Sequence, residues 1–310
     1  MPGQLEGSIG GKSARVRRMR VGVFDDMGRK VLLPQPVGRV VSLVPSDTET
    51  LFALGVGDRV VGRTRYCVEP SRELEAIPVV GGTKDIDVDA IVALSPDVVL
   101  ANQEENSRAG LEALAEAGVH LFVAFPKRFN DAIAHVARLA TMFGAQEAAK
   151  ELLRSGYGEM NPGALSASAP RVFVPIWRDP LMTFGDHTYC NDLLTLAGAQ
   201  NVFVDRERQY PLKADLGLTS PLPADQVANR DKRYPRIRED ELVAKAPEIV
   251  LLPNEPFEFG PEDKAYFESL EIPAAKNQRV VFADGKDLFW PGSRSVDALG
   301  RLRRLIAELS

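Results

Sequence analysis

The sequence contains none of the common catalytic motifs that join a nucleophile, a metal or a nucleotide to an enzyme. It has no G-x-S-x-G, no H-E-x-x-H, no C-x-x-C, and no G-x-G-x-x-G after a predicted strand. Gly81-Gly-Thr-Lys84 ends like a phosphate loop, but Ala76 stands where the loop needs its first glycine. His120, His135 and His187 are not at metal-ligand spacing. We therefore predict a chain that is not an enzyme and has no catalytic cofactor.

Polar and aromatic residues instead gather where the predicted strands end. In open parallel sheets, ligands bind beyond the carboxyl ends of the strands. Large rings with a few polar groups suit a flat, partly apolar ligand. We predict as ligand-binding residues Ser46, Asp47, Tyr66, Glu69, Asn102 and Glu104 in the first half, and Trp177, Arg178, His187, Asn254, Phe257, Phe289 and Trp290 in the second.

Four of these residues have alternative interpretations. Ser46 lies three residues before Glu49, which is the spacing of a capping box, so its hydroxyl could cap the next helix. The two tryptophans could be core residues. His187, in a polar loop, is a candidate metal contact or simply a solvated loop residue.

A repeat indicates which elements position these residues. Residues 89–100 and 240–251 each have the pattern of a short helix, a proline, an acid and a buried strand. Strands that alternate with helices imply mainly parallel sheets. Between the copies, residues 145–165 have apolar side chains three and four apart, which is helical spacing. The predicted fold class is α/β, with two Rossmann-like lobes of mainly parallel sheets joined by one long connecting helix.

The predicted division of the chain follows from this repeat. We expect a flexible tail at residues 1–20, an N-terminal α/β lobe at 21–144, the connecting helix at 145–168 and a C-terminal α/β lobe at 169–310. A hairpin is expected at 21–31. We also expect a single strand at 171–177, a long irregular stretch at 205–238 and a loop at 287–294.

Composition limits the partners and the compartment. The formal net charge of −5 argues against a nucleic-acid partner. The basic residues from Lys12 to Arg20 are followed by only four residues, Val21-Gly-Val-Phe24, before two aspartates, which is too short for the apolar part of a signal peptide. As written, the sequence predicts a cytoplasmic chain. Cys67 and Cys190 fall in different predicted lobes, and we expect free thiols.

Several motifs, taken in order, resemble the class III, helical-backbone substrate-binding proteins of ABC importers. They are Asp25-Asp-Met-Gly-Arg29, residues 39–46 with Thr48 and Glu49, residues 80–85, and the strand at 96–100 with its partner at Pro247. The resemblance implies a metal-chelate ligand, such as vitamin B12, a ferric siderophore or haem, bound between two lobes joined by a long helix. It also implies ABC importer membrane subunits as partners, and a location that is normally periplasmic or membrane-anchored outside the inner membrane.

Within this family the chain looks most like the cobalamin-binding branch, because of Tyr66-Cys67 and residues 101–106 and 175–182. The resemblance implies a corrinoid ligand, whose amide rim suits Asn102, Arg178 and Asn254. Only two arginines, Arg178 and Arg294, are expected near the ligand, which favours a neutral ligand. The alternatives are a ferric-siderophore or haem binding protein of the same fold, a cytoplasmic corrinoid or metal-chelate carrier, and an enzyme on a two-lobe fold.

The resemblance also implies a docking surface for the transporter. Members of the family present acidic residues on each lobe to basic pockets of the importer. Glu73, Glu75 and Glu262 are the predicted docking residues, and an ordinary solvated surface is the alternative. We expect a monomer.

Overall fold

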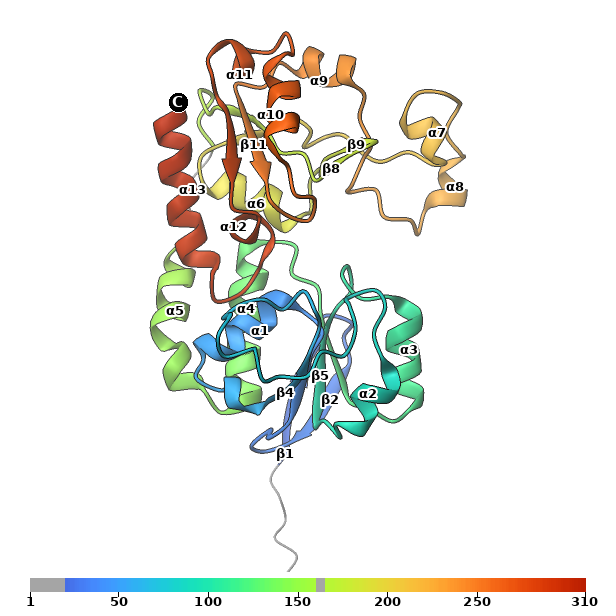
Figure 1. Cartoon of the computed structure of the whole chain (residues 1–310), viewed down its shortest axis with the longest axis vertical. Helices are drawn as coiled ribbons and strands as arrows, with labels where there is room; N and C mark the ends of the chain where they lie inside the picture. The colour runs from blue at the N-terminus through green and yellow to red at the C-terminus, as the bar shows by residue number, and fades with distance from the viewer. Residues whose placement is uncertain (1–19, 160–164) are drawn as a thin grey trace, which may run out of the picture.

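The computed structural model describes residues 20–159 and 165–310, which form two lobes stacked along the long axis of the molecule (Figure 1). Residues 1–19 and 160–164 lie outside the described part, and with them nearly all of the predicted tail. Each lobe is built around a four-stranded parallel sheet. The predicted α/β fold class is therefore confirmed.

In the N-terminal lobe the strands lie in the order β4-β3-β5-β6. All pairs are parallel, and β3 and β5 are fully buried. The predicted hairpin is present as β1 (Arg20–Phe24) and β2 (Lys30–Pro34). The other elements are β3 (Val40–Ser42), α1 (Pro45–Ala53), a 3-10 turn (Gly57–Arg59), β4 (Val60–Arg63), α2 (Val88–Ala93), β5 (Val98–Asn102), α3 (Arg108–Glu116) and β6 (Leu121–Ala124).

In the C-terminal lobe the order is β10-β7-β11-β12, again with all pairs parallel. The strands are β7 (Arg171–Phe173), β10 (Gln200–Asn201), β11 (Ile249–Pro253) and β12 (Val280–Ala283), and a small hairpin is formed by β8 (Trp177–Arg178) and β9 (Leu181–Met182). The helices are α6 (Tyr189–Leu196), α7 (Leu212–Asp215), α8 (Ala224–Val227), α9 (Glu239–Lys245), α10 (Pro261–Glu268), α11 (Pro273–Lys276), α12 (Gly285–Phe289) and α13 (Ser295–Leu309).

The two sheets have the same topology. Numbered along each lobe, the strand order is second, first, third, fourth in both. The strands of the predicted repeat, β5 and β11, therefore occupy equivalent positions, preceded by α2 and α9. In such sheets the strand order reverses beside the first strand, and ligands bind at the carboxyl ends near that point. This places the candidate site after β3 and β5 in one lobe and after β7 and β11 in the other.

A pair of packed helices, α4 (Phe129–Phe143) and α5 (Gln146–Gly158), runs between the lobes (Figure 1). Phe129 and Ile133 of α4 belong to the core of the C-terminal lobe, whereas Leu139 and Phe143 belong to the core of the N-terminal lobe. Gly144, with φ of 67°, ends α4 in the left-handed conformation and lets the chain reverse into α5. The backbone of the molecule is therefore a helical hairpin, to which α13 adds a third packed helix.

The connecting helix is shorter than predicted. It begins at Gln146 and ends at Gly158, and residues 165–168 are not helical. Residues 160–164 of the predicted helix lie outside the described part. The lobe boundaries at 144 and 168 stay a prediction.

Four local predictions were wrong. The first helix is capped by the backbone of Val44, with Pro45 in its first turn, so Ser46 and Glu49 form no capping box. The stretch 171–177 is two strands, because Pro175 has no N–H to continue the ladder after Phe173. Helix α12 enters the predicted loop at 287–294, and α7 and α8 interrupt the irregular stretch at 205–238.

Two further observations concern cysteines and membranes. Cys67 and Cys190 are buried free thiols, as expected. Of the helices in residues 20–159 and 165–310, none has both the length and the apolar character of a membrane span.

Candidate interlobe binding site

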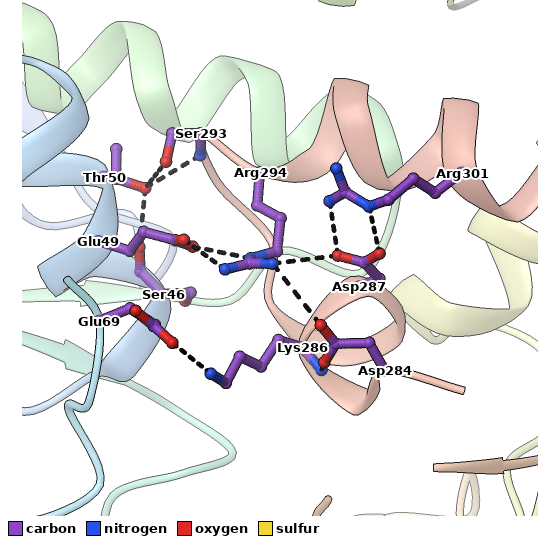
Figure 2. Close-up of polar contacts among 10 residues, drawn as sticks. All are labelled: Ser46, Glu49, Thr50, Glu69, Asp284, Lys286, Asp287, Ser293, Arg294 and Arg301. Atoms are coloured by element: carbon purple, nitrogen blue, oxygen red, sulfur yellow. Dashed lines mark hydrogen bonds and ion pairs between the residues drawn. The ribbon is translucent and has the colours of Figure 1, made fainter. Parts of the chain in front are cut away.

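Side chains from the carboxyl ends of the two sheets meet at the boundary between the lobes. The first cross-lobe contact joins Glu49 of α1 to Arg294, directly before α13 (Figure 2). Glu49 Oε1 lies 2.5 Å from Arg294 Nη2, and Oε2 lies 3.0 Å from Nε. Arg294 also donates through Nη1 to Asp287 at 3.1 Å, and Asp287 accepts two hydrogen bonds from Arg301. Burial lowers the pKa of Arg294, but Glu49 and Asp287 outweigh it, so that the net pKa is raised.

A second contact lies beside the first. Lys286 Nζ, on α12, is 2.5 Å from Glu69 Oε1, in the loop after β4 (Figure 2). Thr50 adds a neutral contact, because its Oγ1 accepts a hydrogen bond from the backbone N–H of Ser293 at 3.0 Å. Both lobes therefore contribute to one polar network around the amino end of α13.

A third contact is made at the carboxyl end of β5. Glu104 Oε1 accepts from the hydroxyl of Tyr234 at 2.9 Å and from Arg233 Nη2 at 2.6 Å. Tyr234 and Arg233 belong to the irregular stretch at 205–238, which thus reaches back to the N-terminal lobe. Burial raises the pKa of Glu104, against the opposing charge of Arg233.

Aromatic side chains follow the strands of the C-terminal lobe, and one of them, Trp290, lies next to this network. Trp290 is 6% exposed, and the cationic groups of Lys286 and Arg294 lie 5.6 and 5.7 Å from its ring centre. Trp177 is 44% exposed and packs edge-on against Phe257 at 5.3 Å. Phe289, in contrast, packs against Phe184 at 6.2 Å and joins the lobe core.

Several predicted site residues have structural hydrogen bonds. Asn102 is buried, and its Oδ1 accepts from the backbone N–H of Glu104 at 2.7 Å, which shapes the turn after β5. Asn254 Oδ1 accepts from the backbone N–H of Gly285 at 2.7 Å and so positions α12. Arg178 pairs with Asp263 at 3.3 Å and stacks on Tyr266, rather than pairing with Asp179.

The remaining predicted residues divide by burial. Ser46 and Asp47 are buried, and Asp47 Oδ1 lies 2.6 Å from His135 Nε2. Tyr66 is 52% exposed. His187 is exposed, and within the described residues no group of three or more His, Cys, Asp or Glu side chains could hold a metal ion.

Two carboxylates of this region were missed by the sequence analysis. Burial and the neighbouring charges of Asp47 and Glu104 raise the pKa of Glu105 to about 8. Burial raises the pKa of Glu255, which follows β11, to about 7. Both stand next to predicted site residues in the sequence, and their position after a central strand was the available signal.

A groove of about 510 Å³ elsewhere is not the candidate site. It lies on the outer side of the N-terminal lobe, between the β1–β2 hairpin and the end of α3, and is lined by residues such as Arg20, Leu32 and His120. None of the predicted ligand-binding residues lines it. Position at the strand ends and cross-lobe contacts are the better guide to function, because ligands of such sheets bind there.

The fold and this position define a two-lobe binding protein, and comparison with known proteins agrees. A family model described as periplasmic binding protein matches residues 40–286. The chain belongs to the periplasmic binding protein family. This is a family of binding proteins rather than enzymes, and its members are typically periplasmic.

Individual relatives have more specific descriptions than the family. A vitamin B12-binding protein of Yersinia pestis (strain Pestoides F) is 29% identical over 182 residues, which are 57% of this chain and 64% of that relative. The match therefore spans less than two thirds of the relative's length.

Two solved structures share the fold. They are the periplasmic vitamin B12 binding protein BtuF of Vibrio cholerae, with a TM-score of 0.67, and the periplasmic heme-binding protein RhuT from Roseiflexus sp. RS-1, with a TM-score of 0.69. Each is 20% identical and covers 88% of this chain, and the match spans 98% and 99% of those chains, respectively. At this identity the likeness shows the fold and not the ligand.

Proposed function

We propose that this chain is a non-catalytic binding protein that captures a corrinoid, such as cobalamin, between its lobes for import by an ABC transporter. The observation that carries the proposal is the set of C-terminal-lobe aromatic side chains, Trp290, Trp177 and Phe257, beside the strand ends, in a chain whose matched relatives are vitamin B12-binding proteins. Aromatic rings cover the apolar face of a flat ring, and the polar groups around them fix its rim.

A haem or ferric-siderophore ligand is the second candidate. It is favoured by Arg233, a third arginine at the lobe boundary that the sequence analysis did not anticipate. Arg178 supports it less, because its guanidinium already pairs with Asp263. We keep the corrinoid as the main proposal because the relatives that match in sequence are vitamin B12-binding proteins.

The visible spectrum of the purified protein tests the ligand class. We expect protein from cells grown with cobalamin to carry the absorption bands of a corrin, in a ratio near one ligand per chain. The same protein from cells grown without cobalamin should be colourless and should take up cobalamin when it is added. A haem spectrum from both cultures would overturn the corrinoid and support the second candidate.

We also propose that Glu73, Glu75 and Glu262 dock on the membrane subunits of the importer, outside the inner membrane. All three side chains are exposed, and in the described part of the chain none of them forms an ion pair. Glu73 and Glu75 lie on one lobe and Glu262, at the start of α10, lies on the other. A transporter with basic pockets above each lobe would be matched by this arrangement.

A further inference from the structure

Within residues 20–159 and 165–310, three ionic contacts join the lobes, and all three have the same polarity. In each, the N-terminal lobe supplies the carboxylate and the C-terminal lobe supplies the cation: Glu49 with Arg294, Glu69 with Lys286, and Glu104 with Arg233. The six side chains are between 16% and 32% exposed, so water only partly screens their charges. These pairs are therefore unlike ordinary surface ion pairs.

Further acidic groups lie on the same side. Asp47 is 2% exposed, and its Oδ2 is a buried oxygen without a hydrogen-bond partner in the described residues. Its charge acts on Glu105, whose pKa is raised by burial and by this neighbour. Asp47 Oδ1 is paired with His135. Two of the cations that face the N-terminal lobe also have carboxylate partners within their own lobe, Asp287 for Arg294 and Asp231 for Arg233. Moving these cations away from the boundary therefore leaves the N-terminal-lobe carboxylates as the groups without a partner.

The C-terminal-lobe cations lie between these carboxylates and the aromatic surface. Lys286 Nζ is 5.6 Å from the ring centre of Trp290 while it pairs with Glu69. Trp290 is only 6% exposed, so a ring that stacks on it has to move a neighbouring group, and this ammonium group is one of two cationic groups within 5.7 Å of its ring centre. When the ammonium group moves away, the carboxylate of Glu69 is half-buried and has no partner. Such a charge strongly disfavours the ligand-bound arrangement unless the ligand itself pairs with the carboxylate.

We infer that Glu49, Glu69 and Glu104 select for a ligand that is cationic or donates hydrogen bonds toward the N-terminal lobe, because the ligand has to replace the C-terminal-lobe cations at these carboxylates. The inference rests on the proposed function in one respect, namely that the ligand binds between the lobes. It goes beyond that function by excluding ligands whose N-terminal-lobe side is anionic, whatever ring they contain.

Two cobinamides with the same ring provide the test. Aquacyanocobinamide carries one positive charge, and dicyanocobinamide is neutral. The free energy needed to separate the lobes is common to both and cancels in the ratio of their affinities. We expect the wild-type protein to bind the cationic form roughly tenfold more tightly, and this preference to fall to about threefold or less in Glu69→Gln and in Glu104→Gln.

Controls and outcomes separate this inference from the proposed function. Glu73→Gln removes an exposed carboxylate and should keep the wild-type ratio. An unchanged ratio in both Glu69→Gln and Glu104→Gln, with binding intact, overturns the inference but not corrinoid binding.

If neither cobinamide binds, haem and its neutral diamide are compared instead. Tighter binding of the diamide then keeps the inference while the corrinoid proposal fails. Tighter binding of haem, or binding of none of the four, overturns the inference.

Discussion

Glu105 is a residue of the N-terminal lobe whose charge is disfavoured by its surroundings. It follows β5, beside Asp47 and Glu104, and burial together with their charges raises its pKa to about 8. In the unfolded chain its pKa returns to about 4.3. Because the folded pKa is the higher one, its contribution to stability is fully present below about pH 4.3 and is lost as the pH rises to about 8.

We therefore predict that Glu105→Gln makes the protein less sensitive to alkaline pH. Between pH 5 and pH 8.5 the melting temperature of the wild-type protein should fall by more than that of the variant, because glutamine has no proton to lose. Thermal unfolding by circular dichroism at the two pH values measures this. The exposed Glu116→Gln, on α3 of the same lobe, is the control and should behave like the wild type. Equal pH dependence in wild type and Glu105→Gln would contradict the pKa assignment.

The predicted site residues that lie at the lobe boundary share one physical basis, and their role in ligand binding stays a prediction. Parallel strands bring their carboxyl ends to one edge, so residues that follow them in the sequence, such as Glu69 and Glu104, are placed together by topology alone. Their partners Lys286 and Arg233 were not anticipated. Lys286 lies on a short helix that begins just before a predicted loop, and Arg233 lies in a stretch without periodicity. No local pattern encodes which charges meet across two lobes.

At the scale of elements, the α4–α5 hairpin depends on one close approach. A Cβ atom added to Gly156 of α5 would lie 2.5 Å from Ile133 Cδ1 of α4. Ile133 is fully buried in the core of the C-terminal lobe, so it has little room to move. Gly156 is thus a point of close approach between the connecting helix and α4.

We predict that Gly156→Ala destabilises the protein by about 1–2 kcal/mol, because the overpacking outweighs the better helix propensity of alanine. Gly158, two residues later in the same helix, has no atom within 4 Å of an added Cβ. Gly158→Ala should therefore stabilise the protein by up to about 1 kcal/mol. Urea unfolding of both variants measures the two signs. A stabilised Gly156→Ala would show that the helices are not closely packed at this point.

The sheets were more predictable than the helix that joins them. The repeated pattern of helix, proline, acid and buried strand located β5 and β11, since a buried parallel strand is a continuous apolar run. The length of α5 was overestimated, because its apolar spacing continues to Met160 whereas the helix ends at Gly158. The prediction of a capping box at Ser46 was wrong because the helix begins one residue earlier, at Pro45, and because Glu49 pairs with Arg294.

At the scale of the whole molecule, the exposed residues Glu73, Glu75 and Glu262 are the predicted contacts with the transporter. We expect the double reversal Glu73→Lys and Glu75→Lys to reduce ligand uptake by cells that express the cognate importer by at least about tenfold, because like charges then face each other. The single reversal Glu262→Lys should reduce uptake in the same direction. Glu116→Lys, an exposed reversal on α3, is the control.

Ligand affinity distinguishes docking from binding. It should stay unchanged in all of these variants when it is measured on the purified proteins. An affinity that falls in parallel with uptake would place Glu73 and Glu75 in the ligand site instead.

Titration of the purified protein with cobalamin, followed by tryptophan fluorescence, tests the central claim most directly, since both tryptophans of the chain are among the predicted ligand-binding residues. We predict saturable quenching with a dissociation constant of about 1 μM or below, and a much smaller amplitude in Trp290→Phe. Trp177→Phe should retain most of the quenching, because Trp290 lies beside the cross-lobe contacts. No quenching by cobalamin or cobinamide, with clear quenching by haem or a ferric siderophore, would contradict the account.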